Sequence, residues 1–246
     1  MSRGVLALTI VGLLTVSMVG NSTIACASPL TVTTTVGGVP ASGTVIDLAA
    51  LPLGNAGGTV DGVSLSFAGT AGVVQGTTPG YYTAPYASGA EGAWFGGGNG
   101  PISSHYLTAG SDLAVAGSGV TVGFAAPQIA FGLLWGSIDS FNQLQVFNGA
   151  TLLGTVTGGT LTVPPQPGFQ NVGSTAYVEV TASTPFDRLV FSSNGYAFEF
   201  ADLTNVPADV PEPSSVALLG GGLALLCVAR FTTPRATLGR RPRRLA

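Results

Sequence analysis

Apolar and polar residues alternate in short segments through the middle of the chain, and this period of two predicts β-strands. In residues 63–67, for example, valine, leucine and phenylalanine alternate with serines. No window with helical periodicity reaches ten residues between positions 28 and 206. The predicted strands lie in residues 31–36, 63–67, 120–124, 143–146, 151–157, 177–180, 189–191 and 196–200.

Turn residues separate these segments. Asn148 and Gly149 stand directly before the 151–157 strand and predict a hairpin, because both tolerate the positive φ of a tight turn. Short strands joined by such turns predict an all-β fold, an antiparallel, jelly-roll-like β-sandwich over residues 28–206, with a closed barrel as the alternative. The residues expected in its core are Phe124, Leu134, Trp135, Leu144, Val146, Val178, Leu189, Phe198 and Phe200.

Uninterrupted apolar runs occur at both ends of the chain. At the start, Arg3 precedes an apolar stretch that ends in Ala25-Cys26-Ala27. This order predicts a secretory signal peptide over residues 1–27, removed by signal peptidase. Acylation of Cys26, as in a lipoprotein, is the alternative.

The C-terminal end has three parts. A linker, residues 207–213, ends in Pro211-Glu212-Pro213; residues 214–229 carry no charge; and residues 230–246 carry only arginines as charged groups. As a helix the apolar run spans about 24 Å, slightly less than a hydrocarbon core of about 30 Å, and long arginine side chains can make up the difference. We therefore expect one transmembrane helix, with the arginine tail cytoplasmic and residues 28–206 outside.

This C-terminal arrangement resembles the PEP-CTERM sorting signal. The residues that carry the resemblance are Pro211, Glu212, Pro213, Arg230, Arg235, Arg240 and Arg241. The resemblance implies that an exosortase recognises and cuts the chain near the Pro-Glu-Pro sequence, after a transient stay in the inner membrane. The product would then reach the outer envelope or the extracellular space. An ordinary single-pass anchor is the alternative.

Charge and cysteine content exclude several kinds of partner and site. The chain has no lysine, and Arg188 is the only cation between positions 28 and 207, which gives the exterior a net charge of about −9. Nucleic acid is therefore not expected as a partner, because phosphate binding needs cations. The exterior also lacks cysteine, and hence disulfides and thiolate ligands.

Two segments interrupt the strand pattern. Residues 76–106 read as a long loop rich in aromatic residues, and sugar rings can pack on such side chains. The candidate glycan contacts there are Tyr81, Tyr82, Tyr86, Trp94 and His105. In the second segment, Asp139 and Asn142 precede a predicted strand, where they would either cap a turn or bind Ca²⁺, the only cofactor considered. A Ca²⁺ site would need Asp202 or Glu199 as a further ligand.

This second segment, Trp135-Gly136-Ser137-x-Asp139-x-x-Asn142, resembles a family of exosortase-dependent surface proteins with a Trp-Gly-Ser-x-Asp-x-x-Asn core. Residues 194–202 resemble the closing strand of that family. The resemblance implies an exported β-sandwich without enzymatic activity, and it carries over no site residues.

The sequence thus predicts a non-enzymatic surface or extracellular-matrix protein. By its resemblance to PEP-CTERM proteins it would be associated with exopolysaccharide or biofilm. A carbohydrate-binding module that uses residues 76–106 is the alternative, and a secreted hydrolase is a third hypothesis.

Overall fold

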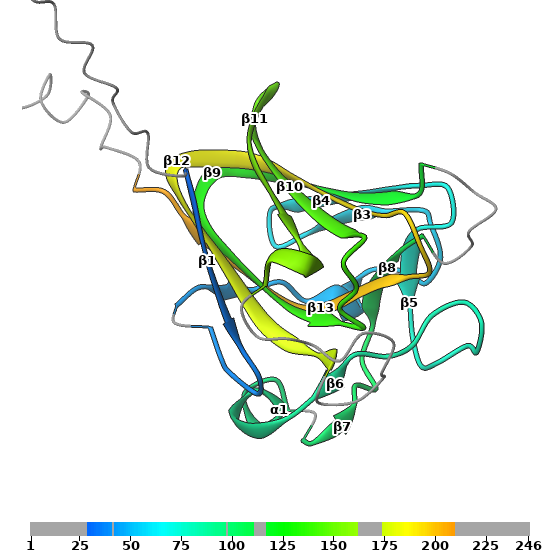
Figure 1. Cartoon of the computed structure of the whole chain (residues 1–246). Helices are drawn as coiled ribbons and strands as arrows, with labels where there is room; N and C mark the ends of the chain where they lie inside the picture. The colour runs from blue at the N-terminus through cyan, green and yellow to red at the C-terminus, as the bar shows by residue number, and fades with distance from the viewer. Residues whose placement is uncertain (1–28, 41, 97, 111–116, 162–173, 210–246) are drawn as a thin grey trace, which may run out of the picture.

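The computed structural model describes residues 29–40, 42–96, 98–110, 117–161 and 174–209, shown in Figure 1. The predicted signal peptide, the apolar span and the arginine tail lie outside these residues. The helices of the described chain are α1 (Gly89–Trp94) and the short 3-10 turns η1 (Leu48–Ala50) and η2 (Gly158–Thr160). The strands are β1 (Leu30–Thr35), β2 (Thr44–Val45), β3 (Gly58–Val60), β4 (Val63–Ala68), β5 (Gly72–Val74), β6 (Tyr86–Ala87), β7 (Gly100–Pro101), β8 (Tyr106–Ala109), β9 (Gly119–Gly136), β10 (Asn142–Asn148), β11 (Thr151–Thr157), β12 (Ala176–Ser193) and β13 (Phe198–Pro207).

Two long antiparallel strands, β9 and β12, organise an 11-stranded sheet. The first part of β9 pairs with β4, whereas its last part pairs with β13. Likewise, the start of β12 pairs with β1 and its end pairs with β10. The register between β9 and β12 shifts between Thr181 and Arg188, and both strands curve strongly in Figure 1. The two halves of the sheet therefore face each other across the core.

All-β structure with antiparallel pairing confirms the coarse fold prediction. The jelly-roll-like sandwich stays a prediction, because β9 and β12 run through both halves of one hydrogen-bonded sheet. The predicted hairpin is present: β10 and β11 are joined through Gly149 and Ala150, with Gly149 at a φ of 56°. No helix in the described part of the chain is long and apolar enough to cross a membrane. The span predicted at 214–229 lies outside that part.

The core confirms most of the burial predicted from alternation. Trp135 stacks on Phe198 with 4.3 Å between ring centroids, and Phe191 stacks on Phe200 at 4.1 Å. The buried residues that were predicted are Leu134, Trp135, Leu144, Val146, Val178, Leu189, Phe198 and Phe200. Phe124 is the exception: it is only half-buried, because it lies where β9 turns from one half of the sheet to the other.

A second, smaller cluster lies on the outer face of the sheet. Leu134, Tyr177 and Ala201 point away from the main core and are covered by the segment that precedes β8. The prediction of one long loop over 76–106 was wrong, since this segment contains β6, α1 and β7. A six-residue helix rich in glycine and alanine is too short to produce a helical hydrophobic period.

The two ends of the described chain lie at the same end of the sheet. Leu30 pairs with Ala182 at the start of β1, while Ala130 pairs with both Thr181 and Val206 near the end of β13. The start of β1 and the end of β13 accordingly lie on the same side of the molecule in Figure 1. The opposite end of β13, at Phe198–Phe200, pairs with β8 and β9.

Candidate functional site

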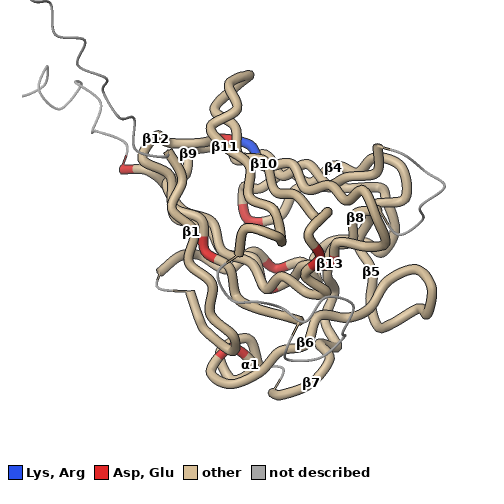
Figure 2. Tube along the Cα trace, in the orientation of Figure 1, with Lys and Arg blue, Asp and Glu red and all other residues tan. Residues whose placement is uncertain are grey.

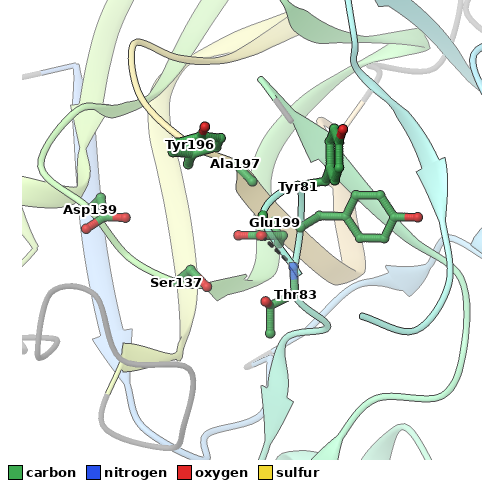
Figure 3. A pocket seen from close by; sticks show the side chains of 9 residues that line it. Tyr81, Thr83, Ser137, Asp139, Tyr196, Ala197 and Glu199 are labelled. Atoms are coloured by element: carbon green, nitrogen blue, oxygen red, sulfur yellow. Dashed lines mark hydrogen bonds between the residues drawn. The ribbon is translucent and has the colours of Figure 1, made fainter. Parts of the chain in front are cut away.

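A pocket of about 260 Å³ lies at the end of the sheet opposite these termini. Its walls come from the turn after β9, from the residues around the start of β13 and from a short turn near residue 80. Gly136 pairs with Glu199, so the antiparallel register brings the first two of these segments together. The lining residues, most of them labelled in Figure 3, are Gly80, Tyr81, Tyr82, Thr83, Ser137, Asp139, Tyr196, Ala197 and Glu199.

Glu199 is the buried polar group of this pocket. Phe198 and Phe200 point into the main core, so the alternation of β13 turns Glu199 to the outer face, where the 80–83 turn covers it. The side chain is 2% exposed, and its Oε1 accepts a hydrogen bond of 2.8 Å from the backbone N–H of Thr83. Oε2 is buried without a hydrogen-bond partner among the described residues.

Burial raises the pKa of Glu199 to about 8, chiefly because desolvation penalises the charged carboxylate. The backbone amides of Thr83 and of Glu199 itself and the hydroxyl group of Ser137 oppose this shift, whereas the negative charge of Asp139 adds to it. Desolvation also raises the pKa of Asp139 above its usual value. At neutral pH Glu199 is therefore mostly protonated, and its Oε2 can donate or accept a hydrogen bond.

Three tyrosines surround this carboxyl group. Tyr81 and Tyr196 are 53% and 54% exposed, although large aromatic side chains are usually covered. Figure 3 shows their rings on either side of Glu199. The ring of Tyr82, unlike those of Tyr81 and Tyr196, packs edge-on against the ring of the buried Tyr106, with 6.3 Å between the two ring centroids. Two solvent-exposed aromatic rings thus stand beside a buried carboxyl group.

The turn after β9 is held by Asn142. Its Nδ2 donates to the carbonyl oxygen of Ser137 at 3.2 Å, and its Oδ1 accepts from the Ser193 hydroxyl at 2.8 Å. Ser137 has a φ of 44°, which non-glycine residues adopt uncommonly. The fully buried Asn142 therefore stabilises the turn that places Ser137 and Asp139 at the pocket.

The residues predicted to contact glycan do not lie together. Tyr81 and Tyr82 line the pocket, but Tyr86 lies in β6 and Trp94 ends α1 with 58% exposure. His105 lies elsewhere, with its Nδ1 3.3 Å from the carbonyl oxygen of Leu48.

Sequence reasoning missed Tyr196 altogether and named Glu199 only as an additional Ca²⁺ ligand. The signal for Glu199 was a carboxylate between two phenylalanines in the predicted 196–200 strand. Within the described ranges, no three His, Cys, Asp or Glu side chains are arranged to hold a metal ion. Ca²⁺ binding by Asp139 and Asn142 stays a prediction.

The buried Glu91 of α1 and the half-buried Asp202 of β13 form a second acidic pair. Glu91 is 1% exposed, and burial together with the charge of Asp202 raises its pKa to about 8, although the Ser88 amide opposes the shift. Asp202 has a φ of 50°, and burial raises its pKa to about 7. Figure 2 shows how the acidic residues are distributed over the described chain, whose one cation is Arg188.

Comparison with known families confirms the predicted sorting signal. Residues 209–230 match the family model of the PEP-CTERM protein-sorting motif. Neither curated proteins nor solved structures gave a match. The motif indicates an exported, cell-envelope-associated protein that an exosortase processes. It covers residues 209–230 and assigns no role to the residues that precede them.

Proposed function

We propose that the exterior binds polysaccharide at the cell surface or in the extracellular matrix through the Tyr81–Tyr196–Glu199 pocket. One observation carries this proposal: two exposed tyrosine rings stand beside a buried carboxyl group whose Oε2 has no partner in the described chain. Proteins seldom keep a buried polar atom unpaired, since this costs about 1–3 kcal/mol. A ligand hydroxyl at Oε2 would remove that penalty.

The chemistry of the pocket matches that of a sugar ring. The faces of a sugar ring carry C–H groups that pack on flat aromatic side chains, while its rim carries hydroxyl groups. Tyr81 and Tyr196 supply such faces, and Glu199, Ser137 and Asp139 supply hydrogen-bonding groups.

The position of the pocket supports the same function. Glu199 and Pro207 lie near opposite ends of β13, roughly 26 Å apart at about 3.3 Å per residue. The sorting motif begins two residues after Pro207. While the predicted helix at 214–229 holds the chain in the inner membrane, the pocket would therefore face away from the bilayer. We also interpret the folded-over sheet as a jelly-roll-like sandwich that carries the pocket at one end.

We propose binding without cleavage, in line with the resemblance of residues 135–142 to non-enzymatic surface proteins. The competing hypothesis is a glycoside hydrolase that uses the two carboxyl groups of the pocket, Glu199 and Asp139. Release of new reducing ends from a bound glycan distinguishes the two, since a binding protein releases none.

A glycan array tests the proposal on the full-length protein purified in detergent. We expect binding to a defined set of glycans, and at least a tenfold weaker affinity after Tyr196→Ala. Trp94→Ala is the matched control, because Trp94 is equally exposed but lies outside the pocket. The absence of binding to every glycan, or equal losses in both variants, would refute the proposed site.

A further inference from the structure

The side chains that can carry a charge around the pocket are all acidic. The ionisable groups near Glu199 are the Asp139 carboxyl from the turn after β9 and the Tyr106 hydroxyl from β8, with Tyr82 beside the latter. The neutral Thr83 amide and Ser137 hydroxyl also act on Glu199 and lower its pKa. The only cation among the described residues, Arg188, lies elsewhere: its Nη2 donates to the carbonyl oxygen of Gly149 at 2.9 Å. No positive group of the described chain therefore faces the Glu199 carboxyl group.

From this arrangement we infer that the pocket is built for a sugar unit carrying a protonated amino group, that is, a non-acetylated amino sugar. The inference rests on the proposed glycan-binding function and specifies its ligand. An ammonium group offers three N–H donors, one of which can meet the unpaired Oε2, and its charge pairs with the carboxylate.

The tyrosines support the same ligand class. A cation over an aromatic face is attracted by the ring quadrupole, so Tyr81 and Tyr196 can hold both the sugar ring and its ammonium group. Uronic acids and sulfated sugars would instead place a negative charge beside Glu199 and Asp139. A neutral sugar could use the rings and the protonated carboxyl group of Glu199 but would gain nothing from the ionised form of that group.

The pH dependence of binding follows from the burial of Glu199. A bound cation requires the ionised carboxylate, whereas the free pocket holds this group mostly protonated below about pH 8. For a ligand with a permanent positive charge, affinity should therefore rise by up to tenfold per pH unit between pH 6 and 8 and then level off.

Calorimetry on the full-length protein in detergent tests the inference with three tetrasaccharides that share a β-1,4 linkage. They are the glucosamine tetramer, its fully N-acetylated form and the neutral glucose tetramer. A glucosamine tetramer with trimethylated amino groups supplies a permanent cation without N–H donors, so its pH series tests the charge pairing alone and not the hydrogen bond to Oε2. We expect wild type to bind the glucosamine tetramer at least tenfold more tightly than either uncharged tetramer.

Glu199→Gln should reduce this preference to less than threefold while leaving the weaker binding of the uncharged tetramers in place. The amide keeps the shape of the side chain and can still accept the Thr83 hydrogen bond. Asp61→Asn is the charge-matched control, because it removes one exposed carboxylate away from the pocket and should keep the preference. Its φ of 52° is one that asparagine tolerates.

Three other results would overturn the amino-sugar inference. Equal affinity for all three tetramers would overturn the amino-sugar inference and leave the proposed glycan binding intact. A preference lost equally in Asp61→Asn would show nonspecific attraction to the acidic surface and would also overturn it. If wild type binds none of these tetramers and no glycan on the array, both the inference and the proposed function fail.

Discussion

Folding stability should decrease as the pH rises from 5 to 8, and Glu199→Gln should make this decrease less steep. The pKa of Glu199 is raised from its ordinary value of 4.5 to about 8 in the folded state, so the folded state binds more protons than the unfolded state between these limits. Stability falls with pH wherever the folded state binds more protons. This stabilisation is present in full below pH 4.5 and is lost as the pH rises through 8.

The magnitude follows from the distance between the two pKa values. One pH unit corresponds to about 1.4 kcal/mol for one fully coupled group. At pH 7 the burial of Glu199 thus costs up to about 3 kcal/mol relative to pH 4.5. Glu91 and Asp202 act in the same direction, with folded pKa values of about 8 and 7.

Urea melts at pH 5, 6, 7 and 8, followed by tryptophan fluorescence, measure this effect on the full-length protein in detergent. Wild type should lose several kcal/mol across the series, and Glu199→Gln should lower the slope by about 1 kcal/mol per pH unit. The slope is decisive because the new amide also changes the hydrogen bonding at every pH. Asp61→Asn, which removes an exposed carboxylate, should give a curve parallel to wild type. A parallel curve for Glu199→Gln would refute the argument that this carboxyl group is buried and protonated.

Four further predictions concern the core, the turn and the sorting signal. Phe198→Ala should cost about 3–5 kcal/mol in urea melts, because the fully buried ring stacks on Trp135, whereas Tyr196→Ala should cost less than about 1 kcal/mol; similar losses would contradict the assigned strand faces. Asn142→Ala should destabilise by about 1–3 kcal/mol through the bonds lost at Ser137 and Ser193, and no loss would exclude its role in holding the turn. Glu212→Gln should leave the melting temperature unchanged but cause a full-length precursor to accumulate in the inner membrane of the native host; normal processing would show that an exosortase does not read this carboxylate. A reporter fused after residue 246 should be active in the cytoplasm, and activity confined to the periplasm would overturn the predicted orientation.

Local patterns in the sequence determined part of the strands, the hairpin and the sorting signal. Period-two alternation is a property of neighbouring residues, so it placed Leu144, Val146 and Val178 in the core and gave the bounds of β11 correctly. It failed at Phe124, because the bend of β9 depends on which strands pair with each of its halves. The sorting motif at 209–230 is also a contiguous feature, and the chain alone was enough to identify it.

The candidate site was decided by tertiary structure. Tyr81 and Glu199 lie more than a hundred positions apart, and their proximity depends on the turn near residue 80 covering the outer face of β13. The same covering removes water from Glu199, and desolvation is what raises its pKa. Alternation alone indicated that Glu199 points away from Phe198 and Phe200. Whether that outer face meets water or another segment depends on long-range packing, which no local pattern encodes.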